Sequence, residues 1–151
     1  MLFRSDTISF PLTNTNYRIL INKHKKLVAK KIEDSEALIK PCKITGKKLV
    51  KGKMQLNLFD GRNVLIDKDD YKVCDTVIFK MPKQDVSTVI KLEKGTFAYL
   101  IGGSHCGETG KVEDITEDKI FIKSKNGDVY ETSKNYAYAL GKEKQIITLL
   151  E

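Results

Sequence analysis

The feature that most constrains the fold is a series of short runs in which apolar and polar residues alternate, with turn signals between them. Residues 54–58 and 62–66 are two such runs, and Asp60-Gly61 lies between them. Alternation puts the apolar side chains on one face of a strand, and a glycine supplies the positive φ that a tight hairpin needs. The pattern therefore predicts a β-hairpin over residues 54–66.

The same arrangement recurs later in the chain, where residues 120–124 and 128–132 flank Asn126-Gly127. Further runs with the composition of strands lie at residues 17–21, 27–30, 76–81, 87–92, 96–101, 111–115, 136–140 and 146–149. Short strands spaced by roughly 8 to 12 residues are typical of small barrels and sandwiches rather than of parallel sheets. The predicted fold class is all-β, with two small β-barrel-like domains.

Only residues 33–40 have the pattern of a helix. An acidic first turn precedes Ala37, Leu38 and Ile39, and Pro41 predicts that the helix ends after a turn or two. We place this helix in the first domain. The composition changes at Gly95, which predicts a domain boundary near residues 91–95.

Positive charge is concentrated in the first part of the chain. Residues 1–60 hold 13 lysines and arginines against 5 acidic residues, whereas residues 61–151 hold 14 against 15. A one-sided positive field attracts polyanions, and nucleic acid is the commonest polyanion inside cells. From charge alone, a lysine-rich surface that keeps the protein soluble is an equally good explanation.

Neither a membrane-spanning segment nor a secretory signal is evident. No apolar run approaches the roughly 20 residues that a spanning helix needs, and residues 1–10 lack the apolar stretch of a signal peptide. We therefore expect an intracellular protein with no membrane partner.

The three cysteines, Cys42, Cys74 and Cys106, lie far apart in the sequence, so a disulfide framework is not expected. A zinc site is disfavoured because only His24 and His105 can add ligands and no C-x-x-C pair is present. Catalysis has one candidate pair, His105 and Cys106, but neighbours in sequence need not point at each other. We expect no metal, no cofactor and no enzymatic activity.

A glycine-rich loop lies between the predicted strands at residues 96–101 and 111–115. Its sequence is Gly102-Gly103-Ser104-His105-Cys106-Gly107-Glu108-Thr109-Gly110. Glycines allow positive φ and a close approach of the backbone to a partner. A nucleotide-binding P-loop is disfavoured, because Val112 stands where Ser or Thr is needed and a strand follows instead of a helix. A tight barrel turn remains an alternative explanation for the glycines.

The order of a strand, a G-x-x-x-G-x-x-G turn and a second strand resembles the KOW motif, an RNA-contacting element of several ribosomal proteins and transcription elongation factors. Other segments extend the likeness over nearly the whole chain, and together they resemble the archaeal and eukaryotic small-subunit ribosomal protein S4e family. These segments are residues 17–20, 51–58, 60–63, 90–95, 101–110 and 136–141.

The resemblance implies a central β domain at residues 17–93 and a KOW domain with an SH3-like barrel at residues 94–151. Residues 1–16 resemble the end of the family's amino-terminal RNA-binding domain, the rest of which we expect to be missing. The implied role is structural, in the cytoplasmic ribosome, with small-subunit ribosomal RNA and neighbouring ribosomal proteins as partners and no small-molecule substrate. Cys74 departs from the family pattern, which has glycine there, and it should lower stability if that position has a positive φ.

The residues that we expect to contact RNA are loop cations and the glycine-rich loop. The cations contact phosphates without reading sequence, while the loop offers backbone amides and polar side chains. The predicted set is Lys23, Lys25, Lys26, Lys47, Lys48, Lys51, Lys53, Arg62, Gly102, Gly103, Ser104, His105, Gly107, Gly110 and Lys111. We expect the lysines to form one continuous cationic surface beside the loop.

Alternatives remain for several of these residues. Arg62 fits a surface salt bridge as well as a phosphate contact, and His105 fits an unpartnered loop position as well as a base-stacking one. The aromatic residues of the second half have the spacing of a barrel core more than that of a stacking platform. For the whole chain, the alternative function is a KOW-containing transcription or translation factor that binds protein.

Overall fold

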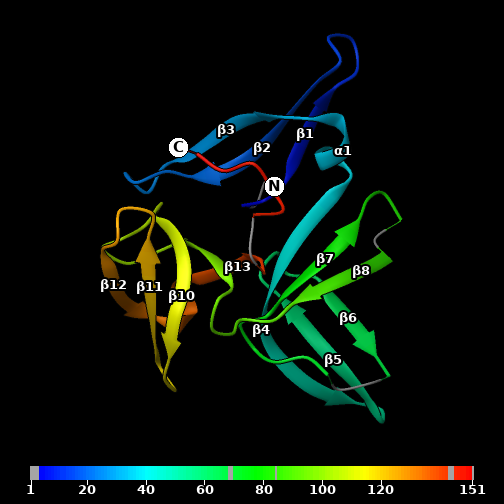
Figure 1. Ribbon diagram of the computed structural model, residues 1–151. Coiled ribbons are helices and arrows are strands. Elements are labelled where there is room, and N and C mark those ends of the chain that lie inside the picture. The colour runs from blue at the N-terminus through cyan, green and yellow to red at the C-terminus, as the bar shows by residue number, and fades with distance from the viewer. Residues whose placement is uncertain (1–3, 68–69, 84, 143–144, 151) are drawn as a thin grey trace.

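The computed structural model describes residues 4–67, 70–83, 85–142 and 145–150, and its strands form three antiparallel sheets (Figure 1). The predicted all-β class is confirmed, with one short α-helix and one 3-10 turn in the described chain. Within those ranges no helix has the length and apolar character needed to cross a membrane.

The first sheet has the order β1-β2-β3 and contains β1 (Thr7–Phe10), β2 (Thr15–Ile21) and β3 (Leu27–Ile32). The helix α1 (Asp34–Ala37) packs beside it. Arg18 of β2 is completely buried and holds the helix, donating to the Glu36 carboxylate and to the Glu36 carbonyl oxygen. These two hydrogen bonds offset the free-energy cost of burying the guanidinium charge.

The helix predicted over residues 33–40 is too long. Ile39 and Lys40 already belong to a strand, because they pair with Lys80 and Phe79 of a neighbouring strand. The interstrand hydrogen bonds override the helical pattern that their side chains show in the sequence.

The second sheet has the order β6-β5-β4-β7-β8. Its strands are β4 (Ile39–Val50), β5 (Lys53–Leu58), β6 (Asn63–Ile66), β7 (Thr76–Lys80) and β8 (Asp85–Ile90). The long strand β4 pairs with β7 over its first part and with β5 over its second part, and the register shifts between Ile44 and Gly46. The core of this sheet packs Ile44, Leu56 and Phe79 together.

The third sheet has the order β12-β11-β10-β9-β13. It consists of β9 (Phe97–Leu100), β10 (Thr109–Ile115), β11 (Lys119–Ser124), β12 (Val129–Ser133) and β13 (Ala137–Gly141), with the 3-10 turn η1 (Lys134–Tyr136) before β13. Strand β9 is buried on both faces. Ala98 and Leu100 join one core, whereas Phe97 and Tyr99 join a second core that includes Leu20 of the first sheet.

Both predicted hairpins are present, and in each the glycine alone takes the positive φ. Gly61 has a φ of 85° between β5 and β6, and Gly127 has a φ of 93° between β11 and β12. The predicted strand over residues 146–149 is wrong, since this segment is irregular. Its apolar residues are nevertheless buried, because Ile147 and Leu149 pack on the core around Phe97.

Cys74 lies in a loop before β7 and has a φ of 78°. The sequence predicts that Cys74 lowers stability if its φ is positive. The φ is positive, so a residue with a Cβ atom occupies a left-handed backbone position. The predicted domain limits at residues 16 and 93 stay predictions.

Candidate nucleic-acid interface

The structure brings the turn between β2 and β3 into contact with the glycine-rich loop. Lys23 forms an ion pair with Glu108 at 2.7 Å between Nζ and Oε1. A Cβ atom on Gly107 would lie 2.7 Å from the backbone nitrogen of Lys23, and the Cys106 thiol lies 3.8 Å from the Asn22 carbonyl oxygen. Lys25 and the neighbouring lysines of the turn remain exposed.

The glycines of the loop have packing roles within the chain. The Tyr136 ring lies against Gly102 and Gly103, and a Cβ atom on Gly102 would lie 2.5 Å from ring carbon Cδ1. On Gly110 it would lie 2.3 Å from the Lys123 carbonyl oxygen. The Gly107 amide donates to the Leu100 carbonyl at 2.7 Å, so this amide already has a partner.

Two side chains of the loop face outward to different extents. Ser104 is exposed, whereas the His105 ring stacks on Tyr130 with the ring centroids 4.4 Å apart and the planes 20° apart. The stack fixes the orientation of the imidazole at the surface. Its neighbour Cys106 is buried and its thiol contacts the Asn22 carbonyl oxygen, so the two side chains do not form a nucleophile-base pair.

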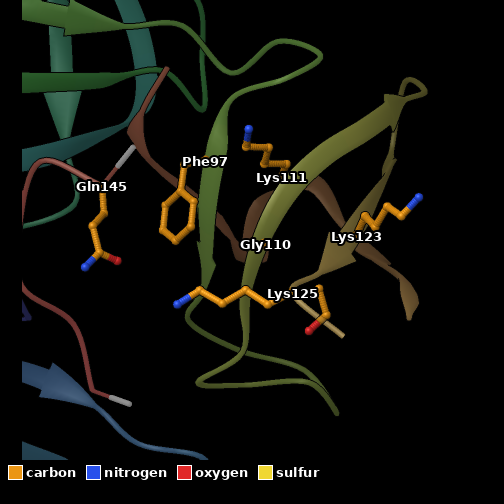
Figure 2. Close-up of a pocket in the computed structure, with 7 residues that line it drawn as sticks. Phe97, Gly110, Lys111, Lys123, Lys125 and Gln145 are labelled. Carbon is orange, nitrogen blue, oxygen red and sulfur yellow. The ribbon is translucent and has the colours of Figure 1, made fainter. Parts of the chain in front are cut away.

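Beside this loop, the third sheet carries a hollow of about 520 Å³, shown in Figure 2. The lining residues are Phe97, Gly110, Lys111, Lys123, Ser124, Lys125 and Gln145. In Figure 2 the Phe97 ring lies next to Gln145, the Lys125 side chain extends below the ring, and the Lys123 amine points away from it.

Lys111 and Lys123 occupy directly opposed positions of β10 and β11. Like charges opposite each other in a sheet are mutually destabilising, and Lys125 adds a third cation two residues further on. The Lys123 amine lies 3.9 Å from the Glu113 carboxylate, and Lys125 lines a neighbouring hollow together with Glu108. Figure 2 shows the three amines pointing in different directions, so they spread positive charge over this part of the sheet.

Lys123 and Lys125 were not among the predicted site residues. In the sequence both precede the Asn126-Gly127 turn, in the half of the chain that has no net positive charge. The consecutive strands β10 and β11 pair with a register shift between Val112 and Asp114, and this register places Lys123 opposite Lys111. The alternation that starts at Ile120 predicts which face of the strand Lys123 occupies. Together with the register of the hairpin, this is the one sequence signal for Lys123 as a site residue.

The second predicted group of lysines lies on the hairpin of β4 and β5. Lys48, Lys51 and Lys53 are exposed, and Lys53 pairs with Asp67 at 3.0 Å. Lys47 is half-buried and donates to the Tyr71 carbonyl oxygen at 2.7 Å. In Figure 1 this hairpin and the turn between β2 and β3 lie at opposite ends of the molecule, so the expected single continuous surface is wrong.

Arg62 pairs with a carboxylate. Its Nε atom lies 3.1 Å from Oδ2 of Asp60, which also accepts a hydrogen bond from Lys40 at 2.8 Å. Burial opposes the ionisation of Asp60, but the hydrogen bonds from Lys40 and from the Arg62 backbone outweigh it and lower the pKa of the carboxyl. The geometry corresponds to the salt-bridge alternative for Arg62.

Several titratable groups are buried away from both lysine groups. Burial raises the pKa of the Cys42 thiol to about 12, and all three cysteines are free and buried. Among the described residues, no three His, Cys, Asp or Glu side chains are placed to hold a metal ion.

Comparisons with known proteins give one consistent result. The model of the family described as "Ribosomal family S4e" matches residues 13–86. The small ribosomal subunit protein eS4 of Methanosphaera stadtmanae is 38% identical over 154 residues, which cover 96% of this chain and 62% of the relative. The protein of the same name from Methanocaldococcus jannaschii is 34% identical over 158 residues, which cover 95% of this chain and 64% of the relative.

A solved structure agrees with these relatives. The crystal structure of the 30S ribosomal protein S4e from Thermoplasma acidophilum superposes with a TM-score of 0.82 at 28% sequence identity, covering 95% of this chain and 74% of that one. The chain thus spans 62 to 64% of the length of the two relatives above.

Proposed function

This chain belongs to the S4e family of ribosomal proteins, and from that premise we propose that it is a structural, non-enzymatic constituent of the small ribosomal subunit that binds ribosomal RNA. Its place is the cytoplasmic ribosome, beside neighbouring ribosomal proteins. The relatives are named as small-subunit proteins, which favours this role over a transcription or translation factor that binds protein.

The observation that supports RNA binding best is the cluster of Lys111, Lys123 and Lys125 beside the glycine-rich loop. Two of these cations are directly opposed in the sheet, an arrangement that neighbouring phosphates would neutralise. Lys23, whose amine pairs with Glu108, and the exposed Lys25 and Lys26 extend this group of lysines across the turn that packs on the loop. We refer to these six lysines as the loop-side group.

In this arrangement the glycines act mainly by letting the chain pack closely, and the loop-side lysines carry the phosphate contacts. Ser104 and the stacked His105 lie where a hydroxyl and an imidazole can reach sugar or base. The contacts fix the position of the RNA, and they supply affinity that depends on salt without reading sequence.

The test is a salt titration of binding to small-subunit ribosomal RNA. With about six phosphate contacts, affinity should fall roughly a thousandfold between low and moderately high salt. Replacing Lys111, Lys123 and Lys125 together by Gln should weaken binding and reduce the magnitude of the salt slope by about two to three, because three contacts are lost.

Two further variants serve as comparisons. A triple Gln variant at Lys72, Lys80 and Lys83 removes the same charge from exposed positions outside both groups and should change binding little. Neutralising Lys47, Lys48, Lys51 and Lys53 tests the other end of the molecule, and any loss there should be similar for all RNA sequences. An RNA affinity that does not depend on salt would contradict the proposal. Equal losses of affinity in the triple variant at Lys111, Lys123 and Lys125 and in the control triple variant would also contradict it.

A further inference from the structure

A second hollow, of about 410 Å³, lies where the three sheets meet. The segment before β1, strand β4, the loop before β7 and the turn η1 all contribute to it. Its lining residues are Arg4, Lys43, Ile44, Thr45, Phe59, Val73, Cys74, Ile101, Asn135 and Tyr136. We call it the junction pocket.

The junction pocket has two cations in its lining and no carboxylate. The Lys43 ammonium is buried and donates to the carbonyl oxygens of Asn135 and Ala137 at 2.7 and 2.5 Å. Burial, together with the positive charges of Arg4 and Lys134, lowers the pKa of Lys43 to about 8. The nearby acidic residues, Glu117 and Asp118, line a separate hollow that adjoins this one.

Arg4 is placed to receive an anion. One guanidinium nitrogen donates to the Ile101 carbonyl at 2.8 Å, and the group lies 4.2 Å from the centre of the Phe59 ring. Burial lowers the pKa of Arg4, so desolvation of its charge already costs free energy. The other N–H groups of Arg4 donate to no acceptor among the described residues and suit the fork geometry of phosphate recognition.

Tyr136 supplies an aromatic surface in the same pocket. Tyr136 is 42% exposed although its ring lies against Gly102 and Gly103, which have no Cβ atoms to displace it. The carbonyl oxygens that hold Lys43 belong to η1 and to the residue after it, so the ammonium positions this tyrosine. A rigid, exposed ring loses little conformational entropy when a base stacks on it.

We propose that the junction pocket binds one unstacked nucleotide of single-stranded RNA, with the phosphate at Arg4 and the base on the Tyr136 ring. The volume falls in the range of about 300 to 1,000 Å³ that is common for small ligands. Splayed bases stacked on aromatic rings beside cations are a common mode of single-strand recognition. This site deepens the proposed RNA-binding function and rests on it.

The chain has no tryptophan, which allows a direct optical test. Tyr136→Trp places a single tryptophan in the pocket, and Phe10→Trp places one on an exposed residue of β1 as the matched control. Adenosine monophosphate should quench the fluorescence at position 136 in a saturable way and leave position 10 unchanged. An unstructured single-stranded RNA of ten nucleotides should do the same and should compete with the mononucleotide.

The phosphate contact is tested with two further ligands and one variant. Adenosine should bind about tenfold more weakly than adenosine monophosphate, because a charge-assisted bidentate contact contributes on the order of a factor of ten or more. Inorganic phosphate alone should not quench the fluorescence, because it has no base to stack on the ring. Arg4→Gln in the tryptophan background should remove the preference for the monophosphate, and Arg4→Lys should restore part of it.

Equal quenching at positions 136 and 10, or equal affinity for adenosine and its monophosphate, would overturn the proposal that the junction pocket binds a nucleotide. If Tyr136→Trp does not fold, equilibrium dialysis of labelled adenosine monophosphate against the unmodified protein replaces it. One saturable site per chain that is lost in Arg4→Gln is then expected, and no saturable binding overturns the proposal. Salt-dependent RNA binding through the loop-side lysines is measured separately, so loss of one result with retention of the other identifies which proposal fails.

Discussion

At the scale of single residues, Cys74 shows how a backbone angle constrains residue choice. Its φ of 78° is strained for any residue with a Cβ atom, yet its thiol is buried and lies 3.8 Å from Oδ1 of Asn135. Glycine would relieve the strain but would also remove a buried side chain. These two effects oppose each other, so a single substitution does not measure the strain.

Comparing Cys74→Gly with Cys74→Ala separates the two effects, because both variants lose the thiol. We expect the glycine variant to be more stable than the alanine variant by about 1 kcal/mol, the usual cost of a left-handed backbone for a residue with a Cβ atom. Urea unfolding followed by circular dichroism measures the difference. Equal midpoints for the two variants would show that the backbone relaxes at this position.

At the scale of structural elements, local turn chemistry made the hairpins predictable. Gly61 and Gly127 lie where their neighbours' alternating patterns require a reversal of direction, and each takes a positive φ. Strand β4 was not predicted, because Pro41 and Gly46 have the composition of breaks in the sequence. Pro41 nevertheless pairs opposite Ile78 in the sheet, and its carbonyl oxygen accepts a hydrogen bond from the Tyr138 hydroxyl at 2.6 Å.

For the candidate site, the sequence likewise predicts local features but not contacts between distant segments. The glycine-rich loop and the exposed lysines of the turn between β2 and β3 could be identified from sequence, because glycine spacing and charge are local features. The contact of Gly107 with Lys23 depends on which elements become neighbours, and the opposition of Lys111 and Lys123 depends on the register of β10 and β11. Sequence patterns set the faces of strands, whereas long-range packing sets their order.

The contact between the loop and the turn leads to an element-scale prediction. Gly107→Ala introduces a Cβ atom against the Lys23 backbone at a φ of 85°, so overpacking and backbone strain add. We expect a loss of about 2 to 4 kcal/mol in the free energy of unfolding. Gly127→Ala is the matched control, since its φ is 93° but nothing lies within 4 Å of the added atom.

The control should lose only about 1 kcal/mol, which represents the backbone cost alone. Chemical unfolding of both variants gives the difference that is due to the contact. Losses of the same size in the two variants would mean that the turn between β2 and β3 does not pack on Gly107 in solution.

At the scale of the whole molecule, the sheets are joined by buried polar groups as well as by apolar cores. Lys40 of β4 contacts Asp6, which precedes β1, at 2.5 Å and Asp60 of the turn between β5 and β6 at 2.8 Å. Arg62 joins the same carboxylate of Asp60. The network ties the segment before β1 to strand β4 and to the turn between β5 and β6, and it requires every member to stay ionised.

The network should make stability depend on pH in the acid range through Asp60. Its pKa is lower in the folded protein than the unfolded value of about 4, so its contribution is present above that pH and is lost as pH falls through the folded value. Asp60→Asn should cost about 3 kcal/mol at neutral pH, the lower end for breaking a buried ion pair, since Lys40 keeps Asp6. The variant should also lose less stability than the parent between pH 5 and 2, because the titrating group is gone.

Urea unfolding at several pH values measures both effects, and Asp128→Asn is the control because Asp128 is exposed in the turn between β11 and β12. The control should keep the parent's pH profile. If Asp60→Asn instead keeps the parent's acid dependence, the carboxylate does not hold the sheets together as an ion. In that case the apolar cores around Ile44 and Tyr99 would have to provide the connection by themselves.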